Sequence, residues 1–252
     1  MRPKKRLSQV FLIAPAVARL IAEAVPLKGK RVLEVGAGRG ILTRELAERA
    51  ASVTAVEIDE DLISRLERAL QTYKRAEIVQ GDALEMPFNG YDAVYGNLPY
   101  HLSSQILFKF LDSDSPLAIF MLQKEFAERL SAKPDSKNYS RLSVMTQAAA
   151  GVERIALVPA DCFEPIPRVD SAVVKLVCRK KKILDASLVT ALFQHKNQTV
   201  RNALLHSERA LGLPKARLAE FAASLDKRDR KVRSLALEDF AELSKAYSSF
   251  AR

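Results

Sequence analysis

A glycine-rich turn between an apolar run and a helical pattern constrains the fold of this chain most strongly. Arg31–Val35 is rich in apolar residues, Gly36-Ala37-Gly38-Arg39-Gly40 follows it, and Ile41–Arg49 has the apolar spacing of an amphipathic helix. Glycine tolerates positive φ angles and lets a ligand come close to the backbone. A strand, such a turn and a helix in this order place a ligand at the helix N-terminus. The sequence therefore predicts a nucleotide-type cofactor site in an α/β domain.

Short apolar runs alternate with helical patterns through the first 180 residues. The seven predicted strands are Arg31–Val35, Ser52–Glu57, Glu77–Gln80, Asp92–Tyr95, Pro116–Leu122, Val152–Val158 and Ala172–Cys178. The predicted helices of this part are Ile41–Arg49, Asp61–Tyr73, Ser103–Leu111, Lys124–Ala132 and Ser140–Ala150. The alternation is typical of a mostly parallel sheet covered on both faces. The last two strands have no clear helix between them, which predicts a hairpin and one antiparallel strand.

The chain ends in a stretch whose pattern is only helical. Its predicted helices are Ala186–His195, Thr199–Leu211, Pro214–Leu225 and Leu237–Phe250. The tetrabasic run Arg179–Lys182 marks the boundary, so we predict an α/β domain over 1–180 and a small all-α domain over 181–252. A length of 252 residues suits such a division.

Composition narrows the class of protein further. Apolar residues make up 48% of the chain and charged residues 28%, which excludes a disordered or collagen-like chain. The two cysteines, Cys162 and Cys178, are too few for a disulfide framework or an all-cysteine metal site, and no metal site is predicted. No run of 18 apolar residues predicts a membrane span. The basic start before Val10–Ala18 imitates a signal peptide, but Pro15 and the continuing helical spacing favour a cytoplasmic protein.

The excess of positive charge is uneven. The net charge is +10, and residues 181–252 hold 14 Lys and Arg against 8 Asp and Glu. Residues 1–180 hold 26 basic against 22 acidic residues. A basic protein often binds nucleic acid or an anionic membrane, although charge for solubility is an equal alternative on composition alone.

Acidic residues near the predicted turn indicate which cofactor it binds. The spacing is G-x-G-x-G rather than the dinucleotide pattern G-x-G-x-x-G, and Glu34 precedes the first glycine by two residues. Ammonium and sulfonium groups favour such a carboxylate. Glu57 ends the next strand and can accept both ribose hydroxyls, while Asp82 can accept from an adenine amino group. The set predicts S-adenosylmethionine, and the spacing disfavours a nicotinamide oxidoreductase.

The segment Asn97-Leu98-Pro99-Tyr100 follows the fourth predicted strand and indicates the reaction. An exocyclic adenine nitrogen is a poor nucleophile because its lone pair is delocalised into the ring. The side-chain oxygen of Asn97 and the carbonyl of Leu98 can hold its hydrogens, Pro99 stiffens the turn, and Tyr100 offers a stacking face. No strong base is needed, so we expect His101 to have a packing role, as we do for both cysteines.

Several motifs in fixed order resemble the small-subunit ribosomal RNA adenine dimethyltransferases, the kasugamycin-sensitivity enzymes and their archaeal and eukaryotic relatives. They are Lys5–Leu12, Glu34–Gly38, Gly96–Tyr100, Met121–Glu125, Tyr139–Val144 and Phe163–Val174, and they extend over nearly the whole chain. The resemblance implies a Rossmann-like class I methyltransferase domain. It also implies dimethylation of two adjacent adenosines near the 3′ end of small-subunit RNA, and a role in subunit assembly.

The resemblance also implies roles for single residues. Tyr100 and Phe163 would sandwich the target adenine, and Asn97 would serve both cofactor and catalysis. The implied cofactor-binding residues are Gln9, Val10, Leu12, Gly36, Glu57, Ile58, Asp82, Ala83 and Asn97. The family often has asparagine where this chain has Val10. At this position the expected contact with the cofactor is therefore made by the backbone. Ser8 stands where glycine is common, and the family's basic stretch keeps only Lys196, Arg201 and Asn202 here.

Basic residues at both chain ends and in the middle are the predicted RNA contacts. They are Lys4, Lys5, Arg6, Lys124, Arg141, Lys196, Arg201, Lys227, Arg228, Arg230, Lys231 and Arg233. The target base must leave its stack before it can reach the methyl group, and RNA exposes bases in loops and helix ends. The expected partner is a partly assembled small ribosomal subunit. The protein is expected to be a monomer. Leu98 and Asp170-Ser171-Ala172 favour this substrate over the large-subunit RNA of macrolide-resistance enzymes. A mainly non-catalytic assembly factor is the other alternative.

Overall fold

The computed structural model describes residues 10–179 and 183–251 and divides the chain into two compact units. The first comprises Met1–Ala127 and Gly151–Arg179, and the second Glu128–Ala150 and Lys180–Arg252. The division after Arg179 agrees with the tetrabasic run, but the predicted boundary missed the excursion of 128–150 into the second unit. That excursion was missed because helix and strand patterns continue through it without a break in composition.

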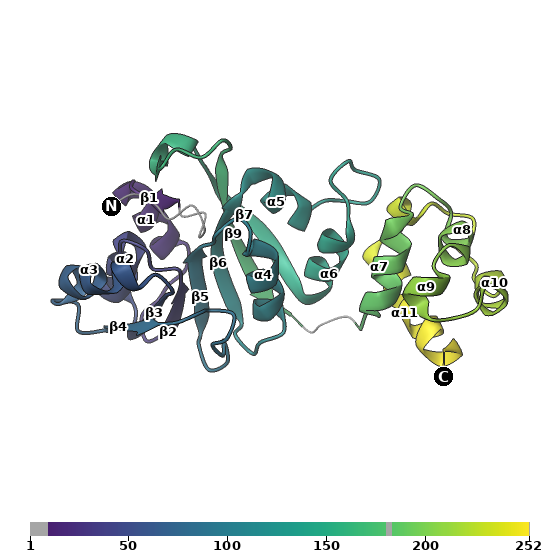
Figure 1. Ribbon diagram of the computed structural model, residues 1–252, viewed down its shortest axis with the longest axis horizontal. Helices are drawn as coiled ribbons and strands as arrows, with labels where there is room; N and C mark the ends of the chain where they lie inside the picture. Colours follow the sequence, from purple (N-terminus) through teal and green to yellow (C-terminus); the bar gives the residue numbers. More distant parts are fainter. Residues whose placement is uncertain (1–9, 180–182, 252) are drawn as a thin grey trace. The chain divides into compact units, whose positions relative to one another are not determined.

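A seven-stranded sheet organises the first unit (Figure 1). Its strand order is β4 (Ala76–Gln80), β3 (Ser52–Glu57), β2 (Arg31–Val35), β5 (Ala93–Asn97), β6 (Leu117–Gln123), β9 (Ser171–Cys178) and β7 (Ala150–Val158). β4, β3, β2, β5 and β6 pair in parallel, whereas β9 runs antiparallel to β6. The predicted mostly parallel sheet with a late antiparallel strand is confirmed.

Helices cover both faces of this sheet, as predicted. Side chains alternate between faces along a strand, and in β6 Ile119 and Met121 share a core with α1 (Pro15–Glu23) and α2 (Ile41–Arg49). On the other face Phe120 meets Phe110 of α4 (Ser103–Leu111) edge to face, with ring centroids 5.7 Å apart. The remaining helices of this unit are α3 (Glu60–Leu70), the 3₁₀ helix η2 (Ala160–Cys162) and the start of α5 (Lys124–Leu130).

A second, two-stranded sheet was not predicted. β1 (Phe11–Leu12) pairs antiparallel with β8 (Phe163–Glu164), so that Phe11 lies opposite Glu164 and Leu12 opposite Phe163. Strands of two residues carry no alternating pattern, which is why the sequence does not reveal them. The pairing joins the N-terminal segment to the loop before β9.

The second unit is helical. It contains α6 (Arg141–Ala149), α7 (Ala186–Gln194), α8 (Val200–Leu205), α9 (Glu208–Leu211), α10 (Lys215–Ala223), η3 (Val232–Ser234) and α11 (Leu237–Phe250). Phe193 stacks on Phe240 in its core, and the Tyr139 hydroxyl donates to the Leu235 carbonyl over 2.8 Å. The single helix predicted over 199–211 is two helices, because the Ser207 hydroxyl turns back onto the Ala203 carbonyl between them. Within 10–179 and 183–251, no helix is long and apolar enough to cross a membrane.

Candidate active site

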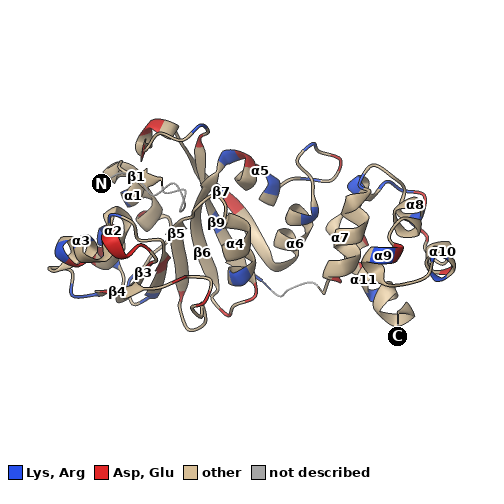
Figure 2. Ribbon diagram, in the orientation of Figure 1, with Lys and Arg blue, Asp and Glu red and all other residues tan. Residues whose placement is uncertain are grey.

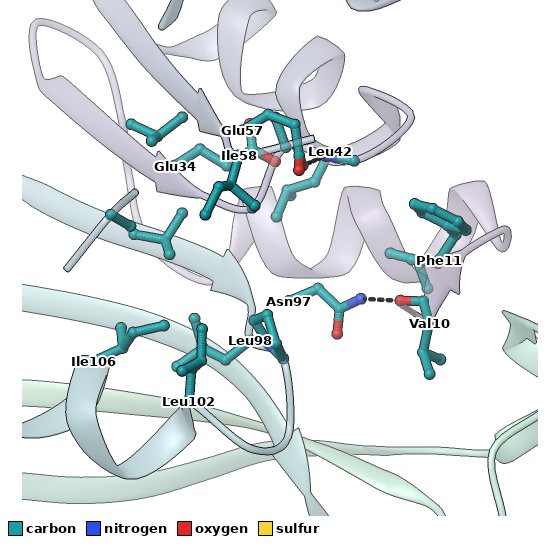
Figure 3. A pocket seen from close by; sticks show the side chains of 18 of the residues that line it. Val10, Phe11, Glu34, Leu42, Glu57, Ile58, Asn97, Leu98, Leu102 and Ile106 are labelled. Atoms are coloured by element: carbon teal, nitrogen blue, oxygen red, sulfur yellow. Dashed lines mark hydrogen bonds between the residues drawn. The ribbon is translucent and has the colours of Figure 1, made fainter. Parts of the chain in front are cut away.

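A cavity of about 310 Å³ lies where the carboxyl ends of β2, β3 and β5 meet the segment around β1 (Figure 3). In a parallel sheet this edge gathers the loops that bind ligands. Eight of the nine predicted cofactor-binding residues line it: Val10, Leu12, Gly36, Glu57, Ile58, Asp82, Ala83 and Asn97. The ninth, Gln9, lies outside the described residues. Sequence positions far apart therefore converge on one cavity, as the strand order requires.

The glycine-rich turn between β2 and α2 forms one wall of the cavity. The backbone N–H groups of Gly36 and Ala37 donate to the Val56 carbonyl over 2.9 and 3.1 Å. Gly36 and Gly38 have φ angles of +74° and +58°, in the left-handed region that favours glycine. A Cβ on Gly38 would lie only 3.3 Å from the Phe11 ring, so any other residue would require that ring to shift by a few tenths of an ångström. The turn is thus fixed both to β3 and against β1.

Glu57 at the end of β3 is held in place by two backbone donors. Its Oε2 accepts from Gly38 N–H over 2.8 Å, and its Oε1 accepts from Asp59 N–H over 2.9 Å. Burial raises the pKa of Glu57, and the two hydrogen bonds oppose that rise by favouring the charged form. Each carboxylate oxygen has a second acceptor direction, as binding of two ribose hydroxyls requires.

Glu34 is the second carboxyl group on the cavity and the one with the fewest partners. It is 1% exposed, and its Oε2 has no hydrogen-bond partner among the described residues. Burial raises the pKa of Glu34 to about 8, and the charge of Glu57 acts in the same direction. A buried carboxyl group without a compensating charge suits a ligand that brings a cation. Glu34 therefore fits the ammonium and sulfonium end of S-adenosylmethionine, in agreement with the preference expected from its place before the turn.

Asp82 and Ile58 give the cavity a lining that suits an adenine ring. Asp82 Oδ1 accepts from Leu84 N–H over 2.8 Å, which fixes the carboxylate at the end of β4. Ile58 is 51% exposed although it is apolar, and it lines the cavity. An apolar side chain and a fixed acceptor are what a base needs for stacking and for its amino group. The lining therefore offers groups that suit the ammonium, ribose and adenine parts of the cofactor predicted from the sequence.

Asn97 connects the cofactor cavity to the catalytic segment. Its Nδ2 donates to the Val10 carbonyl over 2.9 Å. A backbone carbonyl only accepts, so this bond fixes the orientation of the amide and directs Oδ1 away from Val10, as Figure 3 shows. The contact uses the backbone of Val10, so valine at this position does not remove it.

Neighbouring strands and α4 hold the rest of the segment. Leu98 N–H donates to the Met121 carbonyl on β6 over 3.1 Å, while Leu102 N–H and the Ser103 hydroxyl donate to the Pro99 carbonyl. A Cβ on Gly96 would lie 2.7 Å from the Val35 carbonyl, so only glycine lets β5 approach β2 this closely here. The backbone that carries Asn97 and Leu98 is therefore fixed on both sides.

The two aromatic rings expected to hold the target adenine are placed differently. Tyr100 lines the cavity, and its hydroxyl lies 3.3 Å from the Ser171 hydroxyl. Phe163 is 1% exposed, packs in the core cluster that contains Leu12 and Tyr95, and is not among the residues lining the cavity. The pairing of β8 with β1 turns this ring inward. In this structure Phe163 is therefore packed in the core, and its stacking role stays a prediction.

Several cavity residues were missed by sequence reasoning. They are Phe11, Arg39, Ile41, Leu42, His101, Leu102 and Ile106. Phe11 lies between two predicted residues, and His101 directly follows the catalytic segment, so position along the chain could have indicated both. Leu102 and Ile106 are one helical turn apart, which could have marked one face of α4.

The structure divides the predicted RNA-binding residues into paired and unpaired side chains. Lys227 bonds to Asp239 and Glu242 over 2.6 Å each, which raises the pKa of Lys227. Arg230 pairs with Asp239, Arg233 with Asp135, and Arg228 with Asp229. Figure 2 shows acidic and basic residues interspersed in the second unit. Four predicted phosphate contacts thus have acidic partners within the unit.

Other basic residues of the second unit have no such partner. Across the described part of the chain, no ion pair involves Lys196, Arg201 or Lys231. Arg201 N–H donates to the Arg228 carbonyl and Arg233 N–H to the Lys196 carbonyl, so the segments 196–201 and 228–233 lie side by side. We call this pair of segments the basic ridge. Lys4, Lys5 and Arg6 lie outside the described residues, and Lys124 and Arg141 begin α5 and α6.

The chain matches known proteins over almost its full length. The family described as ribosomal RNA adenine dimethylase matches residues 1–241. The probable ribosomal RNA small subunit methyltransferases A of Thermococcus gammatolerans and Pyrococcus abyssi are 38% and 40% identical, with 96% of this chain covered in both and 88% and 91% of theirs.

Solved structures agree with these sequence matches. A dimethyladenosine transferase from Plasmodium falciparum has a TM-score of 0.84 at 27% identity, covering 96% of this chain and 98% of that one. The 23S rRNA methyltransferase ErmE has a TM-score of 0.69 at 30% identity, covering 94% and 99%. The chain therefore belongs to the ribosomal RNA adenine dimethylase family and takes its methyl groups from S-adenosylmethionine.

Proposed function

We propose that this enzyme dimethylates N6 of two adjacent adenosines near the 3′ end of small-subunit ribosomal RNA. The observation that carries the reaction is the acceptor pair of Asn97 and Leu98 beside a cavity with the buried carboxyl groups Glu34 and Glu57. The choice of the small subunit rests on relatives named small subunit methyltransferase A, which match 96% of the chain at 38–40% identity. ErmE, whose name gives 23S rRNA, is 30% identical to this chain, which is below the identity of those relatives.

The residues of the catalytic segment act on the amino group of the target base. Bound S-adenosylmethionine supplies an electrophilic methyl group on a sulfonium sulfur. Asn97 Oδ1 and the Leu98 carbonyl accept the two N6 hydrogens, which draws the lone pair out of the ring and toward the methyl carbon. As the N–C bond forms, the S–C bond breaks, and the amino group then releases one proton to water. Tyr100 stacks on the base, a contact worth about 1–3 kcal/mol.

The second methyl transfer uses the same groups. After one transfer N6 keeps one hydrogen, so one of the two acceptors is sufficient to orient it. A rotated amino group then presents its lone pair to a fresh cofactor. No basic side chain is required at either step, because the proton leaves after the nitrogen has become cationic. His101 therefore needs no proton-transfer role, although it lines the cavity.

Three further aspects of the function belong to this proposal. The partner is a partly assembled small subunit, the enzyme acts as a monomer, and it works in the cytoplasm. The charge of residues 181–252 supports the first of these, since their 14 basic against 8 acidic residues suit a folded RNA that presents phosphates to them. Folded RNA is recognised largely through its shape and through the charge of its phosphates. We therefore expect both units to contribute to RNA binding.

The basic ridge should contribute to RNA binding through its unpaired side chains. Replacing both Arg201 and Lys231 by Ala is expected to weaken subunit binding several-fold. The slope of log affinity against log salt concentration should decrease by about 1.4, since each phosphate contact contributes about 0.7 for single strands. Lys245→Ala on α11 is a matched control, because Lys245 is exposed and lies outside the ridge. An unchanged salt slope in the double variant would assign the ridge a purely structural role.

A competition assay tests the choice of substrate. Unmodified small subunits and naked large-subunit RNA, each with labelled S-adenosylmethionine, should give transfer to the small-subunit RNA alone. Transfer only to large-subunit RNA would refute the proposal and favour the macrolide-resistance type of enzyme.

A further inference from the structure

Strand β1 forms a wall of the cofactor cavity although it is only two residues long. Its link to the catalytic segment is the bond from Asn97 Nδ2 to the Val10 carbonyl, and its link to β8 is the pairing of Phe11 with Glu164 and of Leu12 with Phe163. One more backbone bond, from Ile13 N–H to the Cys162 carbonyl over 2.9 Å, follows it. So short a strand needs side-chain contacts to keep its position.

Arg39 supplies those contacts from the glycine-rich turn. Its guanidinium carbon lies 4.5 Å from the centroid of the Phe11 ring, a cation–π geometry. The same guanidinium donates from Nη1 to Glu164 Oε2. Phe11 and Glu164 are direct partners across the two-stranded sheet, so Arg39 bridges the side chains of one cross-strand pair. The turn, β1 and β8 are thereby joined at one point.

We propose that Arg39 is a positioning residue that holds β1 over the cofactor cavity and, through the Val10 carbonyl, orients the amide of Asn97. A displaced β1 would move Phe11 away from the turn, where a Cβ built on Gly38 would lie 3.3 Å from its ring, and would open the cavity beside the turn. It would also leave Asn97 Nδ2 without its acceptor, so the amide could rotate and withdraw Oδ1 from the target base. Cofactor binding and methyl transfer are coupled through this one contact.

The size of the effect follows from the exposure of the contacts. The side chain of Arg39 is 37% exposed and that of Glu164 58%, so solvent screens their ion pair. An exposed ion pair and an exposed cation–π contact each change an equilibrium by a few-fold. We therefore expect a change of about 5- to 20-fold in cofactor affinity when Arg39 is removed, rather than loss of binding.

The test measures binding of S-adenosylmethionine without RNA, together with steady-state kinetics. This inference rests on the proposed function, but binding by the unaltered protein tests the cofactor separately from the role of Arg39. Arg39→Ala and Glu164→Ala should each raise the Kd for S-adenosylmethionine, and the double variant should resemble Arg39→Ala, as two residues in one contact do. The charge-reversed double variant Arg39→Glu with Glu164→Arg should recover part of the affinity and part of kcat.

Arg44→Ala is the matched control, because Arg44 is an exposed arginine on α2, the helix that follows the turn, and lies outside the cavity. If Arg39 instead contacts RNA phosphate, Arg39→Ala will raise only the KM for RNA, and the charge reversal will not restore it. Additive effects of the two single variants, or cofactor affinity in Arg39→Ala equal to that of the unaltered protein, would overturn the proposal.

Discussion

Replacing Asn97 by Ala should lower the rate of methyl transfer by about 100- to 1000-fold, in the range seen when one preorganised polar group of a reaction site is removed. The substitution removes the acceptor Oδ1 and also the bond from Nδ2 to the Val10 carbonyl. The N6 nitrogen of the target adenine, which receives the methyl group, then keeps its lone pair delocalised into the ring. Single-turnover transfer to unmodified small subunits measures this rate without interference from product release.

Subunit binding by the same variant separates an enzyme from an assembly factor. Asn97 lies at the cofactor cavity and outside the basic ridge, so co-sedimentation of Asn97→Ala with small subunits should remain unchanged. Loss of both binding and transfer would indicate that Asn97 has a structural role. Transfer at the unaltered rate would exclude it as the acceptor for the amino hydrogens.

Affinity for S-adenosylmethionine should rise with pH because of Glu34. Burial raises the pKa of this carboxyl group to about 8, so it is protonated in the empty cavity at neutral pH. A bound cation favours its charged form, and binding therefore releases a proton. We expect the logarithm of the affinity to rise between about pH 6 and pH 7.5, with a slope that approaches 1 per pH unit. This window lies below the range in which the α-amino group of the cofactor loses its own proton. Calorimetry in buffers of different ionisation enthalpy measures both the affinity and the proton released.

The variant Glu34→Gln isolates this group from Glu57, whose pKa burial also raises. It should bind S-adenosylmethionine more weakly at pH 7.5, with an affinity that depends little on pH. A pH-dependent affinity that persists in Glu34→Gln would assign the proton to another group.

Glu34→Gln should weaken cofactor binding, but it should raise the folding stability of the protein without cofactor. The pKa of Glu34 is raised on folding from 4.5 to about 8, so its contribution is present below about pH 4.5 and is lost as pH rises toward 8. The expected loss is on the order of 1 kcal/mol per pH unit in that window. Without cofactor, Glu34→Gln should therefore gain stability over the unaltered protein between pH 5 and pH 8. Denaturant unfolding at several pH values checks the sign.

Features that depend on strand ends could be predicted from the sequence. Glu57, Asp82 and Asn97 each follow an apolar run, and parallel pairing brings such positions to one edge of the sheet. Their convergence on one cavity follows from this rule alone. The type of each long element was equally predictable, because its apolar period is sustained over many residues.

Features that depend on contacts between distant side chains could not be predicted. The partners of Lys227 lie 12 and 15 residues away, so the sequence showed a basic cluster where the structure has ion pairs. The inward turn of Phe163 follows from its pairing with Leu12, 151 residues away, in a sheet too short to leave a pattern. The buried state of Glu34 likewise depends on the packing around β2, which sets its pKa.

Mapping methylated adenosines in small-subunit RNA after reaction in vitro shows directly which atoms this enzyme methylates. Unmodified small subunits would be incubated with the enzyme and S-adenosylmethionine, and RNA fragments would be analysed by mass. We expect two adjacent adenosines near the 3′ end, each carrying two methyl groups on N6, and none with Asn97→Ala. Methyl groups confined to large-subunit RNA, or placed on atoms other than N6 of adenosine, would contradict it.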